Sequence, residues 1–522
     1  MPDNNTKELE RAELHRVIWA IANDLRGSVD GWDFKQYILG MLFYRYISEN
    51  ITTYINDGER DAGILTFNYS LISEIEAEQA RQDIVRTKGF FIPPSELFEN
   101  VLRRAKIDDN LNETLETIFR NIEASARGTE SEANLKGLFD DIDVNSKKLG
   151  NTVTRRNEKL LKLMNGIADM DLGDYKDNTI DAFGDAYEFL MGMYASAAGK
   201  SGGEYYTPQE VSELLTRLTI VNKSEVNKVY DPACGSGSLL LKFAKILGKD
   251  NIRQGFFGQE INITTYNLCR INMFLHDIDF DKFNITLGDT LIDPLNFDDK
   301  PFEAIVSNPP YSIKWDGANN PLLINDSRFS PAGILAPKSK ADLAFILHSI
   351  SWLAENGVAA IVCFPGILYR GGAEQKIRKY LIENNYVDCV IRLPDNLFFG
   401  TSVTTCVLIL KKSKKDKYLL FIDASHEFVK LKNHNKLTPR NIGTILTTYE
   451  NRDTIHYFSK LVSCSEIAKH DYNISVNNYI EREENREAID ISALNLKIQK
   501  INARGVILRN EIAEIIAKID RY

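Results

Sequence analysis

The sequence contains few of the side chains that build metal centres and disulfide frameworks. Its 6 cysteines and 7 histidines are scattered along 522 residues, and none of them forms a CxxC or an HxxxH pair. Structural zinc sites need such close spacings, and disulfide frameworks are typical of short secreted chains. We therefore expect buried free thiols, and we predict neither a disulfide framework nor a bound metal.

Long apolar runs are missing too, so no window approaches the length of a membrane span. Residues 1–10 are mostly polar, unlike a secretory signal. A hydrophobic fraction of 43% and a charged fraction of 26% are ordinary for a globular protein. We expect a cytoplasmic protein that does not contact a membrane and has room for about two to four domains.

Positive charge is in short supply. The chain has 63 Lys and Arg residues against 73 Asp and Glu residues, which gives a formal net charge of −10. A protein that binds DNA unaided usually carries a basic surface, because contacts to phosphates dominate affinity. The acidity therefore argues against a self-sufficient DNA-binding protein. It does not argue against a subunit that a partner brings to DNA.

The first third of the chain is predicted to be helical. Apolar residues recur at helical spacing in several stretches, and no alternating strand pattern competes with them. We expect residues 1–165 to form an all-α domain that serves as an interaction or scaffold module. The predicted helices are Leu9–Arg26, Phe34–Ile47, Asn112–Ser125, Glu130–Phe139 and Asn157–Met170.

From about Asp181 onward, strand-like and helix-like stretches alternate. This alternation predicts an α/β domain over residues 166–480, with a parallel sheet covered on both faces. The last two strand-like runs are joined by a short link, so we expect one of them to enter antiparallel. The predicted strands are Lys228–Ala233, Gly255–Glu260, Ile285–Gly288, Ala304–Asn308, Val358–Phe364, Val387–Leu393 and Thr404–Leu410. The predicted helices are Ser238–Leu247, Thr264–His276, Ala341–Glu355 and Ala373–Glu383.

Residues 481–522 are predicted to form a helical tail with one apolar stripe. Its apolar residues follow an alternating four-three spacing over nearly four heptads, interrupted only at Gly505. This pattern indicates a coiled coil or a helix that docks on a partner. A helix folded back onto its own domain would show the same pattern. The stripe consists of Leu494, Ile498, Ile501, Leu508, Ile512, Ile515 and Ile519.

A glycine-rich turn, Asp231-Pro-Ala-Cys-Gly-Ser-Gly-Ser238, separates a predicted strand from a predicted helix. Gly235 and Gly237 allow a sharp turn and a close approach of a ligand. With Ser236 and Ser238 they lead into a helix start, which offers free N–H groups. The turn does not continue as GxGxxG, and no GxxxxGK[ST] motif occurs. Neither pattern of phosphate-binding loop is therefore indicated.

Acidic residues follow three successive predicted strands, at Asp231, Glu260 and Asp289. In dinucleotide-binding folds an acid at the end of the second strand binds the ribose hydroxyls, and Glu260 takes this place. Asp289 is placed to read the adenine amine. A cofactor with ribose and adenine but without phosphate fits this set, so we predict S-adenosylmethionine.

A segment with two adjacent tyrosines, Gly202–Pro208, directly precedes a helix that we expect to begin near Gln209. We predict that its aromatic pair closes over the methionine end of the cofactor and that Thr207 caps the helix. The residues of this segment assigned to cofactor binding are Glu204, Tyr205, Tyr206, Thr207, Pro208 and Gln209.

The tetrapeptide Asn308-Pro-Pro-Tyr311 ends a strand-like run and indicates chemistry on an exocyclic amine. Such an amine is a poor nucleophile, because its lone pair is delocalised into the ring. The Asn308 side-chain oxygen and the Pro309 carbonyl can accept its two N–H bonds and localise the lone pair. Pro309 and Pro310 stiffen the loop, and Tyr311 can stack on a base that has left the duplex. The motif therefore predicts methyl transfer to a base nitrogen, without a metal.

Together these motifs resemble the amino-methyltransferases of DNA. More closely, the chain is similar to the modification (M) subunit of type I restriction–modification systems. Cys234 stands where the family pattern has an alanine. The matching segments, which span most of the chain, are Gly31–Tyr37, Phe43–Tyr46, Gly202–Gln209, Asp231–Ser238, Glu260, Asp289, Asn308–Tyr311, Lys338–Phe345, Pro365–Glu374 and Leu397–Thr401.

The resemblance implies a helical N-terminal domain followed by a Rossmann-like methyltransferase domain. It implies N6-methylation of adenine in double-stranded DNA with S-adenosylmethionine as the methyl donor. It further implies that two such subunits assemble with one specificity subunit, which reads the target sequence, and that a restriction subunit can join them. The absence of a separate base-reading domain after Asn308 agrees with this division of labour, and the tail is a candidate docking element.

Other functions stay open at this stage. Protein glutamine methyltransferases also use Asn-Pro-Pro-Tyr on an amide nitrogen, although they are shorter and lack the upstream tyrosine segment and the tail. Methylation of an amino group in ribosomal RNA is a second alternative. A non-catalytic assembly subunit and a self-sufficient enzyme that reads its own site are the remaining two.

Overall fold

The computed structural model describes residues 15–18, 33–170, 184, 186, 189–190, 207–398, 403–432, 434–481 and 491–519. The chain divides into two compact units, Met1–Ile480 and Glu481–Tyr522. The six cysteines are free, and five of them are buried. Within the described ranges, no helix has both the length and the apolar character needed to span a bilayer.

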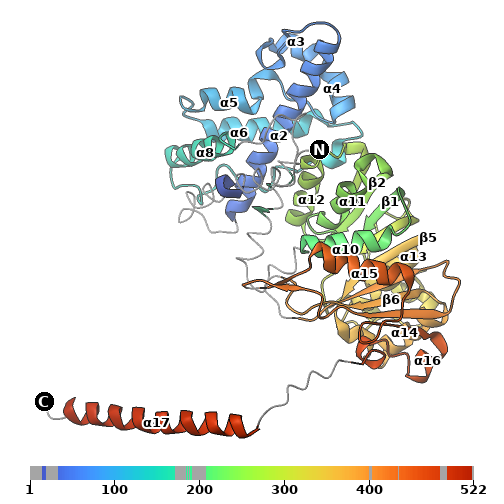
Figure 1. Cartoon of the computed structure of the whole chain (residues 1–522). Helices are drawn as coiled ribbons and strands as arrows, with labels where there is room; N and C mark the ends of the chain where they lie inside the picture. The colour runs from blue at the N-terminus through green and yellow to red at the C-terminus, as the bar shows by residue number, and fades with distance from the viewer. Residues whose placement is uncertain are drawn as a thin grey trace. The chain divides into compact units, whose positions relative to one another are not determined.

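The described residues of the N-terminal part of the first unit form helices joined by turns and loops, without a strand among them (Figure 1). Residues 15–18 are helical, while the rest of the predicted helix Leu9–Arg26 lies outside the described residues. The following helix runs well past the predicted end at Ile47. The α-helices are α2 (Asp33–Asp61), α3 (Glu74–Gln79), α4 (Arg81–Lys88), α5 (Phe98–Ala105), α6 (Leu111–Ser125), α7 (Glu132–Leu135) and α8 (Val153–Ala168).

The predicted helix Glu130–Phe139 is wrong in its second half, because helix α7 ends at Leu135. Beyond it the backbone turns at Gly137, whose φ of 67° lies in the left-handed region. The backbone N–H groups of Gly137 and Phe139 both donate to the Glu123 carboxylate, each at 3.0 Å. These two bonds satisfy the backbone outside a helix, so the helical pattern of the sequence is not followed.

The rest of the first unit is built on a sheet of nine strands in the order β11-β8-β6-β7-β5-β4-β1-β2-β3. Strands β1 to β5 pair in parallel, and β7 runs antiparallel to both β5 and β6. The predicted α/β fold and the predicted antiparallel entry are both confirmed. The strands of this sheet are β1 (Val226–Asp231), β2 (Ile252–Glu260), β3 (Phe283–Leu287), β4 (Phe302–Ser307), β5 (Leu353–Cys363), β6 (Val387–Arg392), β7 (Cys406–Lys411), β8 (Tyr418–Asp423) and β11 (Ser459–Ser463).

Both faces of the sheet are buried, because alternate residues of its strands join two separate apolar clusters. Val229 and Val306 belong to the cluster that contains α10, α11, α12 and α15, while Tyr230 and Ile305 belong to the cluster with α13, α14 and α16 (Figure 1). The covering helices are α10 (Gln209–Thr219), α11 (Ser238–Leu247), α12 (Ile263–Leu275), α13 (Asp342–Trp352), α14 (Ala373–Glu383), α15 (Pro439–Asn451) and α16 (Cys464–Lys469).

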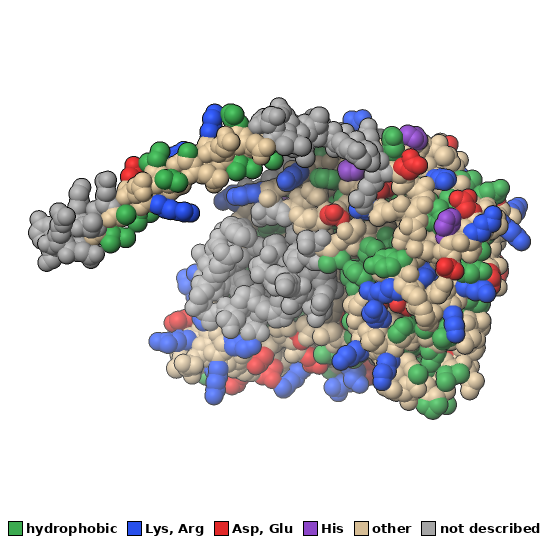
Figure 2. Space-filling view, turned by 90° about the horizontal axis from the view of Figure 1, so that it is seen from below, with side chains coloured by type: hydrophobic (Ala, Val, Ile, Leu, Met, Phe, Trp, Pro, Cys, Tyr) green, Lys and Arg blue, Asp and Glu red, His purple; other side chains and the backbone are tan. Residues whose placement is uncertain are grey.

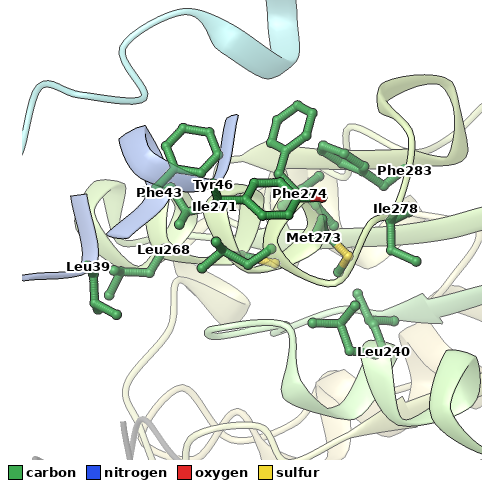
Figure 3. Packing of buried hydrophobic residues seen from close by; sticks show 14 of the residues in the cluster. Leu39, Phe43, Tyr46, Leu240, Leu268, Ile271, Met273, Phe274, Ile278 and Phe283 are labelled. Atoms are coloured by element: carbon green, nitrogen blue, oxygen red, sulfur yellow. The ribbon is translucent and has the colours of Figure 1, made fainter. Parts of the chain in front are cut away.

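The helical part packs against the sheet part through α2 and α12. Figure 3 shows Leu39 and Phe43 of α2 beside Leu268 and Phe274 of α12, within one continuous buried cluster. The guanidinium of Arg270 on α12 reinforces this contact by donating to backbone carbonyls of residues 133, 134 and 136. The two parts therefore share a core, and α12 lies between the helical part and strands β2 and β3 of the sheet.

The predicted helix Ala341–Glu355 ends early, because Leu353 already belongs to β5. Leu353 pairs with Phe302 at the start of β4, so the apolar run changes from helix to strand without a turn residue. Elements after Ser425 that the sequence did not predict include α15, β11, α16 and the two-stranded hairpin β9 (Val429–Lys430) and β10 (Asn435–Lys436).

Within the second unit, the described residues 491–519 form one long helix, α17 (Ile491–Ile519). Its apolar side chains are exposed to solvent: Leu494 is 50% exposed and Ile501 is 69% exposed. Figure 2 shows such apolar side chains, in green, along the helix. The predicted helical tail is therefore present, and the apolar stripe is uncovered in this structure at the described positions.

Candidate active site

The sheet changes winding direction at β1, which has β2 on one side and β4 on the other. The chain leaves β1 for β2 and β3, and it returns through β4 to the opposite side of β1. In open α/β sheets the carboxyl ends of the strands form a crevice at such a point, and ligands bind there. This topology brings the residues that follow β1, β2 and β4 to one edge of the sheet.

Asp231 ends β1 and is fully buried. Its Oδ1 accepts hydrogen bonds from the Ala233 backbone N–H at 2.9 Å and from the Ser307 hydroxyl at 2.7 Å. Its Oδ2 is buried and has no hydrogen-bond partner among the residues that the structure describes. Burial raises the pKa of Asp231 to about 7, and the nearby Glu260 carboxylate adds to this shift. Asp231 thus keeps one unsatisfied acceptor at the carboxyl end of β1.

The glycine turn after Asp231 is held open by backbone conformations that favour glycine. Gly235 has φ 56° and Gly237 has φ 80°. A side chain at Gly237 would lie 2.7 Å from the Cys269 sulfur, whereas the space beside Gly235 is open. The buried Asn272 amide on α12 donates to the Ser236 carbonyl at 2.8 Å and so fixes the turn against that helix. The turn is therefore fixed in conformation, and the space beside the Gly235 backbone is free.

Glu260 ends β2 and reaches the same turn. Its Oε2 accepts the Gly235 N–H at 3.0 Å, and its Oε1 accepts the Asn262 N–H at 2.9 Å. Burial raises the pKa of the Glu260 carboxyl, while these N–H donors act in the opposite direction. Each carboxylate oxygen has two lone pairs, so both keep an acceptor position for hydroxyl donors.

Asp289 follows β3 in a turn tied to the neighbouring strand ends. Its Oδ1 accepts the Leu291 N–H at 2.9 Å. The Thr290 hydroxyl donates to the Pro232 carbonyl at 2.6 Å, which joins this turn to the one after β1. The structure thus brings Asp231, Glu260 and Asp289 to the ends of three neighbouring strands, as the order β1-β2-β3 requires.

Asn308 follows β4, next to the end of β1. Its Nδ2 donates to the Thr207 hydroxyl at 3.1 Å, and its Oδ1 accepts the Tyr311 hydroxyl at 2.5 Å. Pro309 is buried and Tyr311 is half-buried against the core. Burial raises the pKa of Tyr311 well above its usual range, so its hydroxyl stays protonated and donates to Asn308. Both polar atoms of the Asn308 amide are therefore hydrogen-bonded, the oxygen to Tyr311 of the same loop and the nitrogen to Thr207.

Thr207 contributes its hydroxyl to the site and does not cap the helix that follows it. The prediction that it caps the following helix is wrong, because Pro208 occupies the N-cap position of α10 without a capping side chain. Its hydroxyl instead accepts the bond from Asn308. Both polar atoms of the Gln209 side-chain amide are buried, and within the described part of the chain neither has a hydrogen-bond partner. Glu204, Tyr205 and Tyr206 lie outside the described residues.

Two polar residues of the site were not foreseen from the sequence. Ser307 joins the ends of β1 and β4 through Asp231, and Asn272 supports the glycine turn. The only sequence signal for Ser307 is a hydroxyl at the end of an otherwise apolar run, and Asn272 sits within the apolar face of a helix. Tertiary packing alone gives these two side chains their place.

Comparison with known proteins gives consistent matches over nearly the whole chain. Residues 178–488 match the family model described as N-6 DNA methylase, and residues 14–167 match the HsdM N-terminal domain. The methylase subunit of the type I restriction enzyme MpnII from Mycoplasma pneumoniae is 49% identical over 98% of this chain and 97% of its own. The methylase subunit of MjaVII from Methanocaldococcus jannaschii is 29% identical over 93% of this chain and 81% of its own.

A solved structure shares the fold. The crystal structure of a type I restriction–modification methyltransferase subunit from Streptococcus thermophilus has 36% identity, and its TM-score is 0.82. The match covers 90% of this chain and all of that one.

Proposed function

The chain belongs to the N-6 DNA methylase family, as a methylase subunit of type I restriction enzymes, and from this premise we propose its reaction and partners. It transfers a methyl group from S-adenosylmethionine to N6 of adenine in double-stranded DNA. A separate specificity subunit reads the target sequence. Two copies of this chain join one specificity subunit, and a restriction subunit can join the complex. Its location is the cytoplasm.

One observation carries the proposal: the Asn308 amide is fixed at the end of β4, beside the end of β1. The amide oxygen has two lone pairs, and the Tyr311 hydroxyl occupies only one of them. The second can accept one N6–H bond of adenine, and the Pro309 carbonyl can accept the other. These two acceptors draw the nitrogen toward tetrahedral geometry and localise its lone pair. Because the acceptors are already in place, little reorganisation is needed during the reaction.

The residues at the carboxyl ends of β1, β2 and β3 fit S-adenosylmethionine. The buried, unpartnered Oδ2 of Asp231 suits a cationic group, and the remaining lone pairs of Glu260 suit ribose hydroxyls. Asp289 suits the adenine amine, and the open space beside Gly235 lets the ligand approach the backbone. When bound, the cofactor supplies an electrophilic methyl group on a sulfonium. The segment of Glu204, Tyr205 and Tyr206 is proposed to cover its methionine end, next to Thr207, Pro208 and Gln209.

Substituting Glu260 with alanine is expected to raise the Kd for S-adenosylmethionine about 10- to 100-fold. A hydrogen bond to a charged group contributes about 1.5–3 kcal/mol, and about 1.4 kcal/mol changes an affinity tenfold. Titration calorimetry of the purified chain measures the change. Glu303→Ala is the matched control, because Glu303 also accepts a backbone N–H, that of Asn227, but at the opposite end of the sheet. Equal losses in the two variants would contradict the assignment.

The affinity for S-adenosylmethionine is expected to rise between pH 6 and 8, on either side of the Asp231 pKa of about 7. In the free protein the buried carboxyl keeps its proton to a higher pH than in the unfolded chain. Its contribution to stability therefore falls as pH rises from about 4 to 7. A cationic ligand favours the ionised form, so binding releases a proton near neutral pH and strengthens as pH rises. Calorimetry in buffers of different ionisation enthalpy measures both effects.

Asp231→Asn provides the control for this pH dependence, since it keeps the shape and removes the titrating group. The variant should bind more weakly at pH 8 and show a flat pH profile. A slope that persists in Asp231→Asn would assign the titration to another group.

We also propose the division of the chain into residues 1–165, 166–480 and 481–522, as expected from the sequence. The helical part before Met170, the sheet of β1 to β11 and the separate helix α17 support it. The exposed apolar stripe of α17 suits a partner subunit, and the net charge of −10 suits a subunit that reaches DNA through that partner.

The proposed reaction is tested by co-expressing the chain with a specificity subunit and supplying S-adenosylmethionine with a tritiated methyl group. The complex should label DNA as N6-methyladenine, in a form resistant to ribonuclease, and the chain alone should label none. Label in RNA or in a release factor would favour the two alternative substrates. Methylation of a defined DNA site by the chain alone would favour a self-sufficient enzyme.

A further inference from the structure

The catalytic loop leaves the site through a strained residue. Directly after Asn308-Pro-Pro-Tyr311, Ser312 has a φ of 52°, in the left-handed region that residues other than glycine rarely adopt. Its backbone N–H donates to both carboxylate oxygens of Asp342, each at 3.1 Å. Asp342 is only 6% exposed and is the first residue of α13. The strained conformation is thus held by a residue that lies 30 positions farther along the chain.

The backbone on either side of this bond is fixed as well. The Ala341 N–H donates to the Ile313 carbonyl at 3.0 Å, and the Trp315 N–H donates to the Lys338 carbonyl at 3.0 Å. The Trp315 indole N–H donates to the Pro337 carbonyl at 3.1 Å. Residues 312–315, here called the exit segment, therefore lie along residues 337–342.

The buried Asp342 carboxylate accepts its hydrogen bonds from one backbone N–H, that of Ser312. In the described parts of the chain, no ion pair to its carboxylate is found, and its hydrogen bonds are those from Ser312. Burying a carboxylate is costly unless it is paired or hydrogen-bonded, although a helix start favours negative charge. The hydrogen bonds of this buried acid go to Ser312, directly after the catalytic loop. Its role is therefore best explained as fixing the conformation of that loop.

We propose that Asp342 is a positioning residue for the methyl transfer, a role that rests on the proposed function. By holding Ser312 in the left-handed conformation, it fixes the residue that precedes it, Tyr311. The Tyr311 hydroxyl in turn meets the Asn308 oxygen at 2.5 Å. Without the anchor, Ser312 relaxes to an ordinary conformation, and the ring that stacks on the base and the amide that accepts its N–H both lose their alignment.

The test measures single-turnover methylation rates of the complex that this chain forms with its specificity subunit. The rates of wild type and of Asp342 variants are compared. Asp342→Ala should lower the methylation rate about 10- to 100-fold, the scale expected for small misplacement of reacting groups. Asp342→Asn keeps one neutral acceptor oxygen, so its methylation rate should lie between the rates of wild type and Asp342→Ala. The Kd for S-adenosylmethionine should not change in either variant, because the anchor is not among the cofactor contacts.

A second substitution separates positioning from folding. Glycine adopts the left-handed conformation without strain. Adding Ser312→Gly to Asp342→Ala should therefore raise the methylation rate at least about tenfold above that of Asp342→Ala alone. If Asp342 only supported the start of α13, the glycine at position 312 would restore nothing. A double variant no faster than Asp342→Ala, or an Asp342→Asn variant as fast as wild type, overturns the proposal.

Asp388→Asn is the matched control for a buried acid with a structural role. Its carboxylate on β6 contacts Lys411, Arg452 and Tyr449, away from the exit segment. This variant should lose thermal stability while its folded fraction keeps the wild-type methylation rate. An equal rate loss in Asp388→Asn would attribute the Asp342 effect to general destabilisation and overturn the proposal. A wild-type complex that methylates no DNA would instead refute the proposed function.

Discussion

Asn308→Ala is expected to lower the methylation rate by about 10²- to 10³-fold, the scale seen when one preorganised polar contact to a reacting group is removed. The substitution removes the oxygen that accepts an N6–H bond of adenine, and it leaves the Tyr311 hydroxyl without its acceptor. It also leaves Thr207 without its donor. Transfer of tritiated methyl groups to DNA by the complex measures the loss.

Two controls make this result specific. The Kd for S-adenosylmethionine of Asn308→Ala should stay near that of wild type, because the proposed cofactor contacts of Asp231, Glu260 and Asp289 are unchanged. The thermal midpoint should show that the variant is still folded at the assay temperature, although the unpaired Tyr311 hydroxyl lowers it somewhat. Asn308→Asp keeps an acceptor for the amine but loses the N–H that donates to Thr207, so it should keep more activity than alanine. Full activity in Asn308→Ala would contradict the role of the Asn308 amide in the methyl transfer.

The elements that the sequence predicted well carry their own boundary signals. Helices α11 and α14 begin and end at the predicted residues, and glycine precedes each of them: Gly237 with φ 80° and Gly372 with φ 68°. The acids at the ends of β1, β2 and β3 were predictable for a related reason. Parallel strands place their carboxyl ends at one edge, so local strand assignments were enough to bring the side chains together.

The parts that failed depend on partners distant in the chain. Thr207 before Pro208 reads locally as a helix cap, yet its hydroxyl meets Asn308, which lies 101 residues away. Leu353 continues the apolar pattern of a helix, and only its pairing with Phe302 places it in β5. The Ser312–Asp342 anchor has the same character. In each of these places the local structure is determined by a contact with a residue far along the chain. Neither the periodicity of the sequence nor a turn residue predicts such a contact.

Removing residues 481–522 is expected to weaken assembly with the specificity subunit by more than about a hundredfold. Several apolar side chains of α17 are about half exposed, among them Leu494, Ile498, Leu508 and Ile512. Covering the exposed half of such a side chain contributes about 1 kcal/mol, so a stripe of them supplies several kcal/mol. Size-exclusion chromatography with light scattering measures the complex. The Kd for S-adenosylmethionine should remain that of the full chain, because its proposed contacts all precede Ile480.

A pair of neighbouring substitutions tests whether the stripe itself makes the contact. Ile501→Glu places a charge on the stripe, whereas Asn502→Glu places the same charge one residue farther around the helix. The first should weaken assembly at least about tenfold, since a buried charge without a partner is costly, and the second should have little effect. If α17 instead packs onto its own catalytic part, truncation would lower the thermal midpoint of residues 1–480 and leave assembly intact. That outcome would assign the heptad pattern to intramolecular packing.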